Sequence, residues 1–433
     1  MKKSDDKPLV GFFPLSYNLA ETGRAVLVAK RYMELGGRVV FFSHGGKYEY
    51  LIEEFGFDLI KVNPRYTDEI VKEIVGINRG EKPGVPYKVS FLREAVKAEI
   101  DAFKKTDVKM VVSFVNLPCS VSARVIGIPL VCVSPAPGRF HLGVPDNFEN
   151  FLTRLIPTVV KIPISNYLLG HTKKFLKPFN IVAGEHDLKP FSSTVEVVYG
   201  DITLGTNFLE FINVFPDQQM FPDEDYVGII SLKEIFSDRF SKNELKKVET
   251  EIRKHLARPG KSILLTMGSS GDKEVYLKIL RILNKTSYNV VAVYANILKE
   301  DEIPHLNDNI LLLNFVPSIE RLHKMVDISI IHGGQGTVFA AAYAGKPIIG
   351  FPMNFEQYLN LEKMVGHGVG FILSRKFFKE KEFIKTIDKT INNYNNYLIK
   401  AVELSKKLPK PKGDTNAAHR IIEILKQKNL VKQ

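Results

Sequence analysis

The chain has 433 residues, 45% of them hydrophobic, which is enough for two domains of about 200 residues, each with its own core. Lysine and arginine outnumber aspartate and glutamate by 60 to 48, so the formal net charge is +12. Such a balance favours anionic partners, but no aromatic-studded basic motif, zinc-finger spacing or helix-turn-helix pattern is present, which argues against nucleic acid.

The sequence also indicates the cellular compartment of the protein. Cys119 and Cys132 stand in apolar surroundings and are expected to be reduced core residues of a cytosolic protein. The first residues, M-K-K-S-D-D-K-P, lack the apolar core of a signal peptide, and no segment reaches the roughly 18 apolar residues of a membrane span. We therefore expect a cytoplasmic protein, with peripheral contact to the inner face of the cell membrane left open.

The first half begins with the strand, helix and strand of a Rossmann-like unit. No G-x-G-x-x-G follows the first strand, so a nicotinamide or flavin site is not expected there. The pattern predicts strands over 9–13, 38–43, 110–114 and 130–133, and helices over 24–35, 64–80 and 87–105. The loop 134–141 follows the carboxyl end of a strand, and by this position it is expected to contact an acceptor substrate.

Residues 151–183 alternate apolar patches with lysine and arginine. Packed helices with solvated lysines would explain this pattern. The alternative is a surface that meets lipid and its anionic headgroups.

Residues 213–227 have the prolines and charge of an interdomain linker. Their acidic run Asp223-Glu224-Asp225 imitates a metal-binding D-x-D motif, but with prolines nearby and no further acidic cluster it is expected to be a solvated turn.

The second half repeats the strand, turn and helix opening without repeating the sequence. Asp414 is expected to cap a last helix, and the tail 404–433 carries eight basic and two acidic residues. The pattern predicts helices over 242–256 and 274–283, two more within 377–407, and strands over 262–266, 290–294 and 310–313.

The stretch 326–360 carries the clearest functional signal. A β-branched run ends at His332, a glycine-rich turn follows, and an alanine-rich helix then runs to Gly345. Such a turn lets backbone N–H groups and a helix dipole face an anion, most simply a diphosphate. His332 can donate one further hydrogen bond, and Glu356 beside Gln357 can bracket neighbouring hydroxyls of a sugar.

These residues resemble the donor-binding signature of the UDP-glycosyltransferase family, which has the GT-B fold. The resemblance continues at 315–317, beside the nucleotide base, and at 267–270, a phosphate loop. It covers most of 260–370 well and the first half loosely; the peptidoglycan GlcNAc transferases are similar in layout. The matching positions are His332, Gly334, Thr337, Gly345, Pro347, Pro352, Glu356 and Gln357.

The resemblance implies an α/β fold of two Rossmann-like domains facing across a cleft. We expect an acceptor domain over 1–225, a donor domain over 226–410, and a C-terminal helix, 411–433, that packs back on the first domain. The expected donor-binding residues are Gly268, Ser269, Ser270, Phe315, Val316, His332, Gly333, Gly334, Gln335, Gly336, Thr337, Glu356 and Gln357.

The general base is the open point. Members of the family usually keep a histidine after the first strand and an aspartate that orients it, and alignment places Glu21 and Ser113 there. Glu21 is therefore the first candidate base, with His44 and His141 as alternatives. The family also commonly has a glutamate at the position of Ala340, so dTDP and GDP stay open beside UDP.

The expected function is inverting, metal-independent transfer of a sugar from a nucleotide diphosphate sugar to a hydroxyl. No metal or cofactor is expected, because the nucleotide sugar is a substrate. We expect the acceptor to be lipid-linked or a small hydrophobic molecule, and we expect no nucleic-acid partner. Two alternatives remain: a non-catalytic GT-B partner subunit, and a nucleotide-sugar 2-epimerase.

Overall fold

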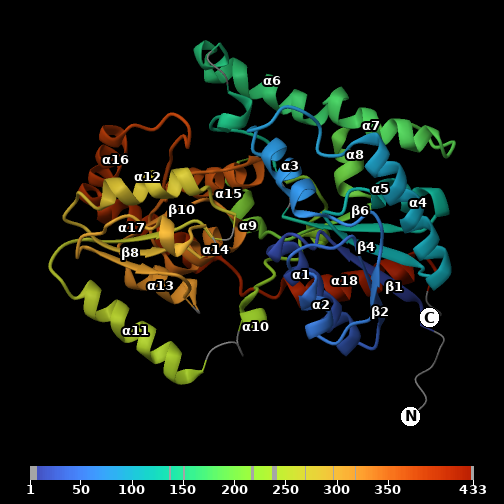
Figure 1. Cartoon of the computed structure of the whole chain (residues 1–433), viewed down its shortest axis with the longest axis horizontal. Helices are drawn as coiled ribbons and strands as arrows, with labels where there is room; N and C mark the ends of the chain where they lie inside the picture. Colours follow the sequence, from blue (N-terminus) through green and yellow to red (C-terminus); the bar gives the residue numbers. More distant parts are fainter. Residues whose placement is uncertain are drawn as a thin grey trace.

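The computed structural model describes residues 7–135, 138–149, 152–215, 219–236, 241–268, 270–295, 297–316 and 318–430. These residues form two halves that lie side by side, each around a six-stranded parallel sheet (Figure 1). The strand orders are β3-β2-β1-β4-β5-β6 and β12-β11-β10-β7-β8-β9. In both sheets the order reverses beside the first strand, β1 or β7, as in the Rossmann fold.

The first sheet is covered on both faces because its strands alternate. Val10 and Phe12 of β1 pack on one face, while Phe13 packs on the other. Phe12 lies opposite Val112 of β4 in the parallel register. The strands are β1 (Leu9–Pro14), β2 (Arg38–Ser43), β3 (Leu59–Lys61), β4 (Met110–Phe114), β5 (Leu130–Ser134) and β6 (Ile202–Gly205).

The helices of the first half lie on both faces of this sheet and along its upper rim (Figure 1). They are α1 (Leu19–Glu34), α2 (Tyr50–Glu54), α3 (Asp68–Asn78), α4 (Val89–Thr106), α5 (Cys119–Ile126), α6 (Thr158–Gly170), α7 (Lys173–Gly184) and α8 (Thr194–Tyr199), with 3₁₀ turns η1 (Asp146–Phe148), η2 (Thr153–Leu155) and η3 (Asp223–Asp225). The short helix α9 (Leu209–Ile212) follows β6 and packs Phe211 and Ile212 against the second half.

The second sheet is built in the same way, with Leu265 of β7 opposite Ile330 of β10. Its strands are β7 (Ser262–Thr266), β8 (Asn289–Val293), β9 (Ile310–Leu313), β10 (Ile328–Ile331), β11 (Ile348–Gly350) and β12 (Gly370–Ile372). Its helices are α11 (Lys242–Leu256), α12 (Lys273–Leu283), α13 (Ile319–Met325), α14 (Gln335–Ala344), α15 (Phe355–Gly366), α16 (Glu380–Asn392) and α17 (Tyr394–Lys407), with η4 (Glu300–Glu302). The short helix α10 (Lys233–Phe236) precedes them and packs on the first half, where Ile235 belongs to the core cluster of Phe12.

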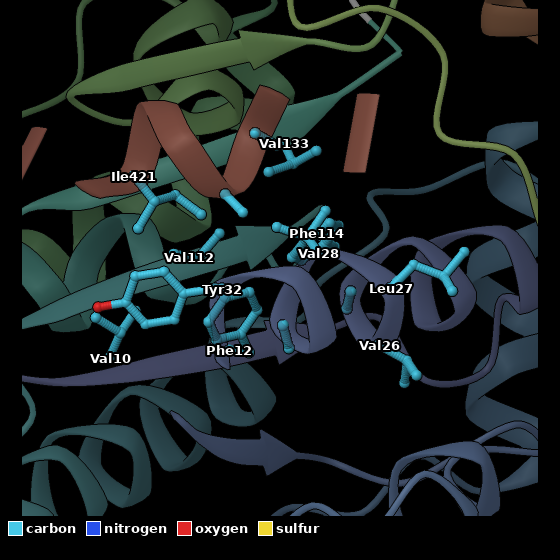
Figure 2. Close-up of a cluster of buried hydrophobic side chains, with 14 of the residues drawn as sticks. Val10, Phe12, Val26, Leu27, Val28, Tyr32, Val112, Phe114, Val133 and Ile421 are labelled. Atoms are coloured by element: carbon cyan, nitrogen blue, oxygen red, sulfur yellow. The ribbon is translucent and has the colours of Figure 1, made fainter. Parts of the chain in front are cut away.

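The last helix, α18 (Gly413–Gln427), returns to the first half, as predicted. Its fully buried residues Ala418 and Ile421 belong to the core cluster that contains Phe12 and Val112. Figure 2 shows Ile421 above Val112 within this cluster. Because α18 fills the same face as α1, the first half contains both ends of the described chain (Figure 1).

Several predicted details were wrong. The first helix begins at Leu19, five residues before the predicted start, because Asn18 caps it. Asp414 does not cap α18; it instead accepts a hydrogen bond from Arg31 Nε at 2.8 Å. Asp225 is buried rather than solvated, because Arg420 Nε binds it at 2.9 Å.

The segment 151–183 is more regular than its sequence indicated. Apart from Phe151, which lies outside the described residues, it forms η2, α6 and most of α7, and α6 continues through Pro163. Within the described part of the chain, no helix combines the length and the apolar composition that a membrane crossing requires.

Candidate functional site

A cleft with a volume of about 2450 Å³ lies between the two halves. It is lined by residues that follow β1 and β5 in the first sheet and β7 and β10 in the second. Ligands of open α/β sheets collect beyond the carboxyl ends of the strands, where the strand order reverses. Pockets that bind one ligand usually measure about 300–1000 Å³, so this cleft has room for two substrates together.

Two glycine turns enclose the His332 ring on the second half. A Cβ atom at Gly268 would lie 2.9 Å from His332 Cε1, and one at Gly334 would lie 2.5 Å from Nε2. Gly268 and Gly333 also have positive φ angles of +54° and +94°, which glycine adopts without strain. The chain therefore brings two turns and the N-terminus of α14 around one imidazole.

His332 is buried, and its Nδ1 has no hydrogen-bond partner among the described residues. Burial and the nearby charge of Arg79 lower its pKa to about 3. The ring is therefore neutral near pH 7 and can donate a hydrogen bond from one nitrogen.

Polar side chains of α15 join the loops that follow β7 and β11. Gln357 Nε2 donates to Ser270 Oγ at 3.2 Å, and Gln357 Oε1 accepts from the Met353 N–H at 2.8 Å. Glu356 accepts a hydrogen bond from Asn360 Nδ2, and burial raises its pKa above the ordinary range. The loops after β7 and β11 are thus held as one unit.

On the opposite side of the cleft, α1 presents a buried ion pair. Arg24 Nη1 donates to Glu21 Oε1 at 2.8 Å, and the two side chains are 6% and 8% exposed. Arg24 Nη2 reaches across to Gln335 Oε1 at 3.1 Å. Glu21 Oε2 is buried and has no hydrogen-bond partner within the described part of the chain. One carboxylate oxygen is therefore held, and the other can accept a proton or a hydrogen bond.

Comparisons with known proteins find similar sequences and similar folds. The model of the glycosyltransferase family 28 C-terminal domain matches residues 262–420. The chain is 25% identical over 168 residues to an uncharacterized UDP-glucosyltransferase, YojK, of Bacillus subtilis, covering 38% of this chain and 41% of YojK. It is 24% identical over 294 residues to a Mycobacterium tuberculosis PGL/p-HBAD biosynthesis glycosyltransferase, covering 66% of this chain and 64% of that protein.

A shorter match, 30% identical over 108 residues, is to the human 2-hydroxyacylsphingosine 1-beta-galactosyltransferase; it covers 24% of this chain and 20% of that enzyme. Each of these alignments spans less than two thirds of the relative's own length.

Solved structures agree over nearly the whole chain. The glycotransferase of kitacinnamycin superposes with a TM-score of 0.65 at 14% identity, covering 96% of this chain and 99% of that one. The glycosyltransferase VinC, solved in complex with DTDP, superposes with a TM-score of 0.59 at 14% identity, covering 97% and 100%. The chain has the GT-B fold of these structures, and its second half matches the glycosyltransferase family 28 C-terminal domain. The predicted GT-B fold is thereby confirmed.

Most residues that the family signature selected line the cleft of this GT-B protein. Of the candidate bases, Glu21 and His141 line it, and the His141 ring stacks on Phe215 with centroids 4.5 Å apart. Ser269 and Pro317 lie outside the described residues. The cleft-lining members of the donor set are Gly268, Ser270, Phe315, Val316, His332, Gly334, Gln335, Gly336, Thr337, Glu356 and Gln357.

His44 is placed differently from the expectation, and two predicted donor residues that line the cleft, Gln335 and Gln357, also have hydrogen-bond partners within the protein. His44 does not line the cleft; it is buried, with Nε2 2.9 Å from Glu99 Oε1 and Nδ1 3.0 Å from Pro64 O. Gln335 directs its amide to Arg24 and to Thr206, whose carbonyl accepts from Nε2 at 2.8 Å. Gln357 joins two loops of its own half through both ends of its amide.

Two further predicted residues have local structural roles. Thr337 Oγ1 donates to Gly334 O at 2.8 Å and so stabilises the start of α14. Ser113, at the position of the family's aspartate, is buried and exchanges hydrogen bonds with the backbone of Asn116. It lies outside the cleft lining and does not orient Glu21.

Sequence reasoning missed three residues that join the halves here. Arg24 follows Glu21 by one helical turn, and this spacing could have revealed it. Arg79 ends α3 and donates to Ser270 O at 2.8 Å, a contact that no local pattern predicts. Glu362 of α15 accepts from the His141 and Leu142 N–H groups at 2.9 and 2.6 Å. Among the described residues, no three His, Cys, Asp or Glu side chains gather as metal ligands.

Proposed function

We propose that this protein transfers a sugar from a nucleotide diphosphate sugar, with a UDP-sugar as the first choice, to a hydroxyl group. The observation that carries this proposal is the pair of glycine turns around His332, facing the buried Glu21 across one cleft. The related proteins named above as glycosyltransferases support the same reaction class. Donor binding is supported by VinC, whose structure contains DTDP.

The donor diphosphate would lie on the turns after β7 and β10. Backbone N–H groups, the N-terminus of α14 and the neutral His332 can stabilise the negative charge that develops on it, without a metal. Glu356 lies on the same rim and can bind hydroxyls of the sugar.

Glu21 is our candidate for the general base. Arg24 fixes Oε1, while Oε2 is buried and has no partner among the described residues. Oε2 can therefore take the proton of the acceptor hydroxyl as its oxygen attacks the anomeric carbon. The base and the diphosphate loops lie on opposite halves, so attack from the side away from the leaving group, with inversion, is the outcome we expect.

The first test is thermal unfolding against UDP, dTDP, GDP and their sugars, with His332→Ala in parallel. A nucleotide that binds only the folded state raises the midpoint, and the shift should shrink in His332→Ala. Glu21→Gln should then bind the donor normally but lose transfer. Unchanged midpoints with every nucleotide would contradict the donor site and favour the partner-subunit alternative. Formation of a 2-epimer from the donor sugar would favour the epimerase.

We further propose that the acceptor is lipid-linked and that α6 contacts the membrane. Residues 150–184 contain five lysines or arginines and no aspartate or glutamate. Several apolar residues of α6 and η2 face solvent, with Leu155 75% and Val159 78% exposed. In Figure 1, α6 runs along the upper edge, outside both sheets. The exposed apolar side chains of this segment are Leu152, Leu155, Ile156, Val159, Val160, Ile164, Tyr167, Leu168 and Ile181.

The same segment continues into the cleft, because Ile162, Pro163 and Leu169 line it. An apolar chain anchored in a bilayer can therefore lie along α6 with its hydroxyl in the cleft. Exposed apolar side chains and basic residues together favour an anionic bilayer surface. The galactosyltransferase of hydroxyacylsphingosine named above acts on a lipid, which supports this acceptor class.

Vesicle flotation tests the membrane contact. The protein should float with vesicles that contain phosphatidylglycerol and float less with phosphatidylcholine alone. Leu155→Ser combined with Val159→Ser should reduce flotation, whereas Ile399→Ser, at a 56% exposed residue of α17, is the matched control. Equal flotation of both variants would leave a small hydrophobic acceptor as the better choice.

A further inference from the structure

The donor loops of the second half carry little positive charge. Its described cleft-lining residues between Thr266 and Gln357 include no lysine or arginine. The one imidazole among them, His332, is neutral because its pKa is about 3. Backbone N–H groups supply partial charges, but a diphosphate carries at least two full negative charges. Arginines of the first half that line the cleft, Arg24 and Arg79 among them, can supply a full positive charge.

Arg79 brings such a charge to the phosphate loop. It stands at the C-terminal end of α3, and its Nη2 donates to Ser270 O at 2.8 Å and lies 3.4 Å from Gly271 O. Its side chain is 18% exposed and lines the cleft. The charge also reaches His332, whose pKa it helps to lower.

Other N–H groups of the Arg79 guanidinium remain available as hydrogen-bond donors. Within the described part of the chain, its side-chain hydrogen bonds involve only Nη2. The two nearest carboxylates, of Asp272 and Glu81, lie 3.9 and 4.0 Å from Nη1, at the limit of an ion pair. Arg24 differs from Arg79 in this respect, because both of its terminal nitrogens already donate hydrogen bonds, to Glu21 and to Gln335.

We propose that Arg79 binds the diphosphate of the donor and stabilises it as the leaving group, a role that rests on the function proposed above. The planar guanidinium can donate two parallel hydrogen bonds to phosphate oxygens. When the acceptor oxygen bonds to the anomeric carbon, the electron pair of the broken C–O bond passes to the diphosphate. Arg79 then offsets that charge without giving up a proton, while the acceptor's proton goes to Glu21.

A purely structural role is the competing explanation. Arg375 of the second half donates to Glu81 Oε1 at 3.1 Å and to the Arg79 carbonyl, so this corner also joins the halves. A residue that only joins the halves would affect every ligand of the cleft to the same extent. A residue that binds phosphate affects ligands according to their number of phosphate groups.

Isothermal titration of the full chain with UDP, UMP and uridine separates the two roles, with dTDP, dTMP and thymidine in parallel. Arg79→Met should weaken binding of the diphosphate by about 10-fold or more, because a charge-assisted hydrogen bond is lost. The monophosphate should lose less, and the nucleoside should stay within about twofold of the wild type. Arg79→Lys keeps the positive charge but loses the planar guanidinium. Its affinity for the diphosphate should therefore lie between those of the wild type and Arg79→Met.

Glu81→Gln is the matched control, because it disturbs the Arg375 contact and leaves the Arg79 side chain in place. All three affinities should stay within about twofold in this variant. Equal losses for diphosphate and nucleoside in Arg79→Met, or no loss for the diphosphate, would overturn the role of Arg79. If the wild-type protein binds neither series, the proposed function itself fails, an outcome distinct from failure at Arg79 alone.

Discussion

Arg24 of α1 and Gln335 of α14 form a hydrogen bond of 3.1 Å between the two halves of the molecule. Gln335 starts α14 and Arg24 lies in the second turn of α1, and both helices lie beside the point where the strand order reverses. Arg24 also holds Glu21, so the contact between the halves and the candidate base share one guanidinium. Approach of the halves therefore fixes the base and the donor turn relative to each other.

The Glu21–Arg24 pair should be strongly coupled in stability. Removing Arg24 in Arg24→Met leaves a buried carboxylate without its partner, and we expect unfolding to become easier by about 3–5 kcal/mol. The double variant Glu21→Gln with Arg24→Met should cost less than Arg24→Met alone, because the stranded charge is gone. Urea unfolding of the wild type, Glu21→Gln, Arg24→Met and the double variant measures this coupling. Strictly additive costs would show that the pair is not coupled.

Two neighbouring glycines should respond in opposite directions to alanine. At Gly334 the added Cβ would lie 2.5 Å from the His332 ring, so Gly334→Ala should lower the free energy of unfolding by about 1–3 kcal/mol. At Gly336, inside α14, an added Cβ would have no atom within 4 Å apart from its chain neighbours and the backbone of its own helix. Gly336→Ala should therefore raise the free energy of unfolding by about 0.5–1 kcal/mol. Chemical denaturation compares the two. A loss at both positions would argue against the described packing around His332.

Glu362 should protect the loop that follows β5. Its Oε1 accepts the His141 and Leu142 N–H groups, so Glu362→Ala removes their acceptor. Hydrogen exchange of these two amides should become about 10-fold faster or more, since each lost bond costs about 1–3 kcal/mol. Glu362→Gln keeps an acceptor oxygen and is the control. Unchanged exchange in Glu362→Ala would mean that the loop is held by other contacts.

Buried histidines should make the protein less stable in mild acid. Burial lowers the pKa of His323 from 6.5 to about 3, and its Nδ1 lies 2.7 Å from Ser329 Oγ. Between these pH values the unfolded chain binds a proton that the folded chain does not, so this contribution to stability is complete above 6.5 and is lost as the pH falls. From pH 7 to pH 5 the loss should be about 2 kcal/mol for this residue.

Between pH 7 and pH 5, the free energy of unfolding should fall less in His323→Asn than in the wild type, and the difference should be about 2 kcal/mol. Urea unfolding at pH 7, 6 and 5 gives the comparison. Parallel profiles for the wild type and His323→Asn would contradict the assignment. His323 suits this test because it is fully buried and does not line the cleft.

The sequence predicted the fold well where periodicity was strong. The strands 110–114 and 310–313 and the helix 242–256 have the predicted bounds, because each is a clear run between breakers. Short strands such as Leu59–Lys61 and Gly370–Ile372 were missed, since three residues carry no measurable period. The predicted domain boundaries at 225 and 410 remain predictions.

The site could be predicted only where it is local in sequence. His332 and the glycines around it follow one strand, so one stretch of chain revealed them. Contacts between the halves carry no such signal: Arg79 and Ser270 are 191 residues apart, and Arg24 and Gln335 are 311 apart. His44 was chosen because it ends a strand, but its ring turns into the core, where Glu99 binds it.

The position of α18 also affects how the chain can fold during its synthesis. Ala417, Ala418 and Ile421, near the end of the chain, complete the core that Val10 and Phe12 begin. A ribosome would have to make the whole second half before the first half could bury those side chains. The second half, whose sheet lies within 262–372, can close before the last helix has left the ribosomal tunnel. In this protein the half that is synthesised second is therefore free to finish folding first.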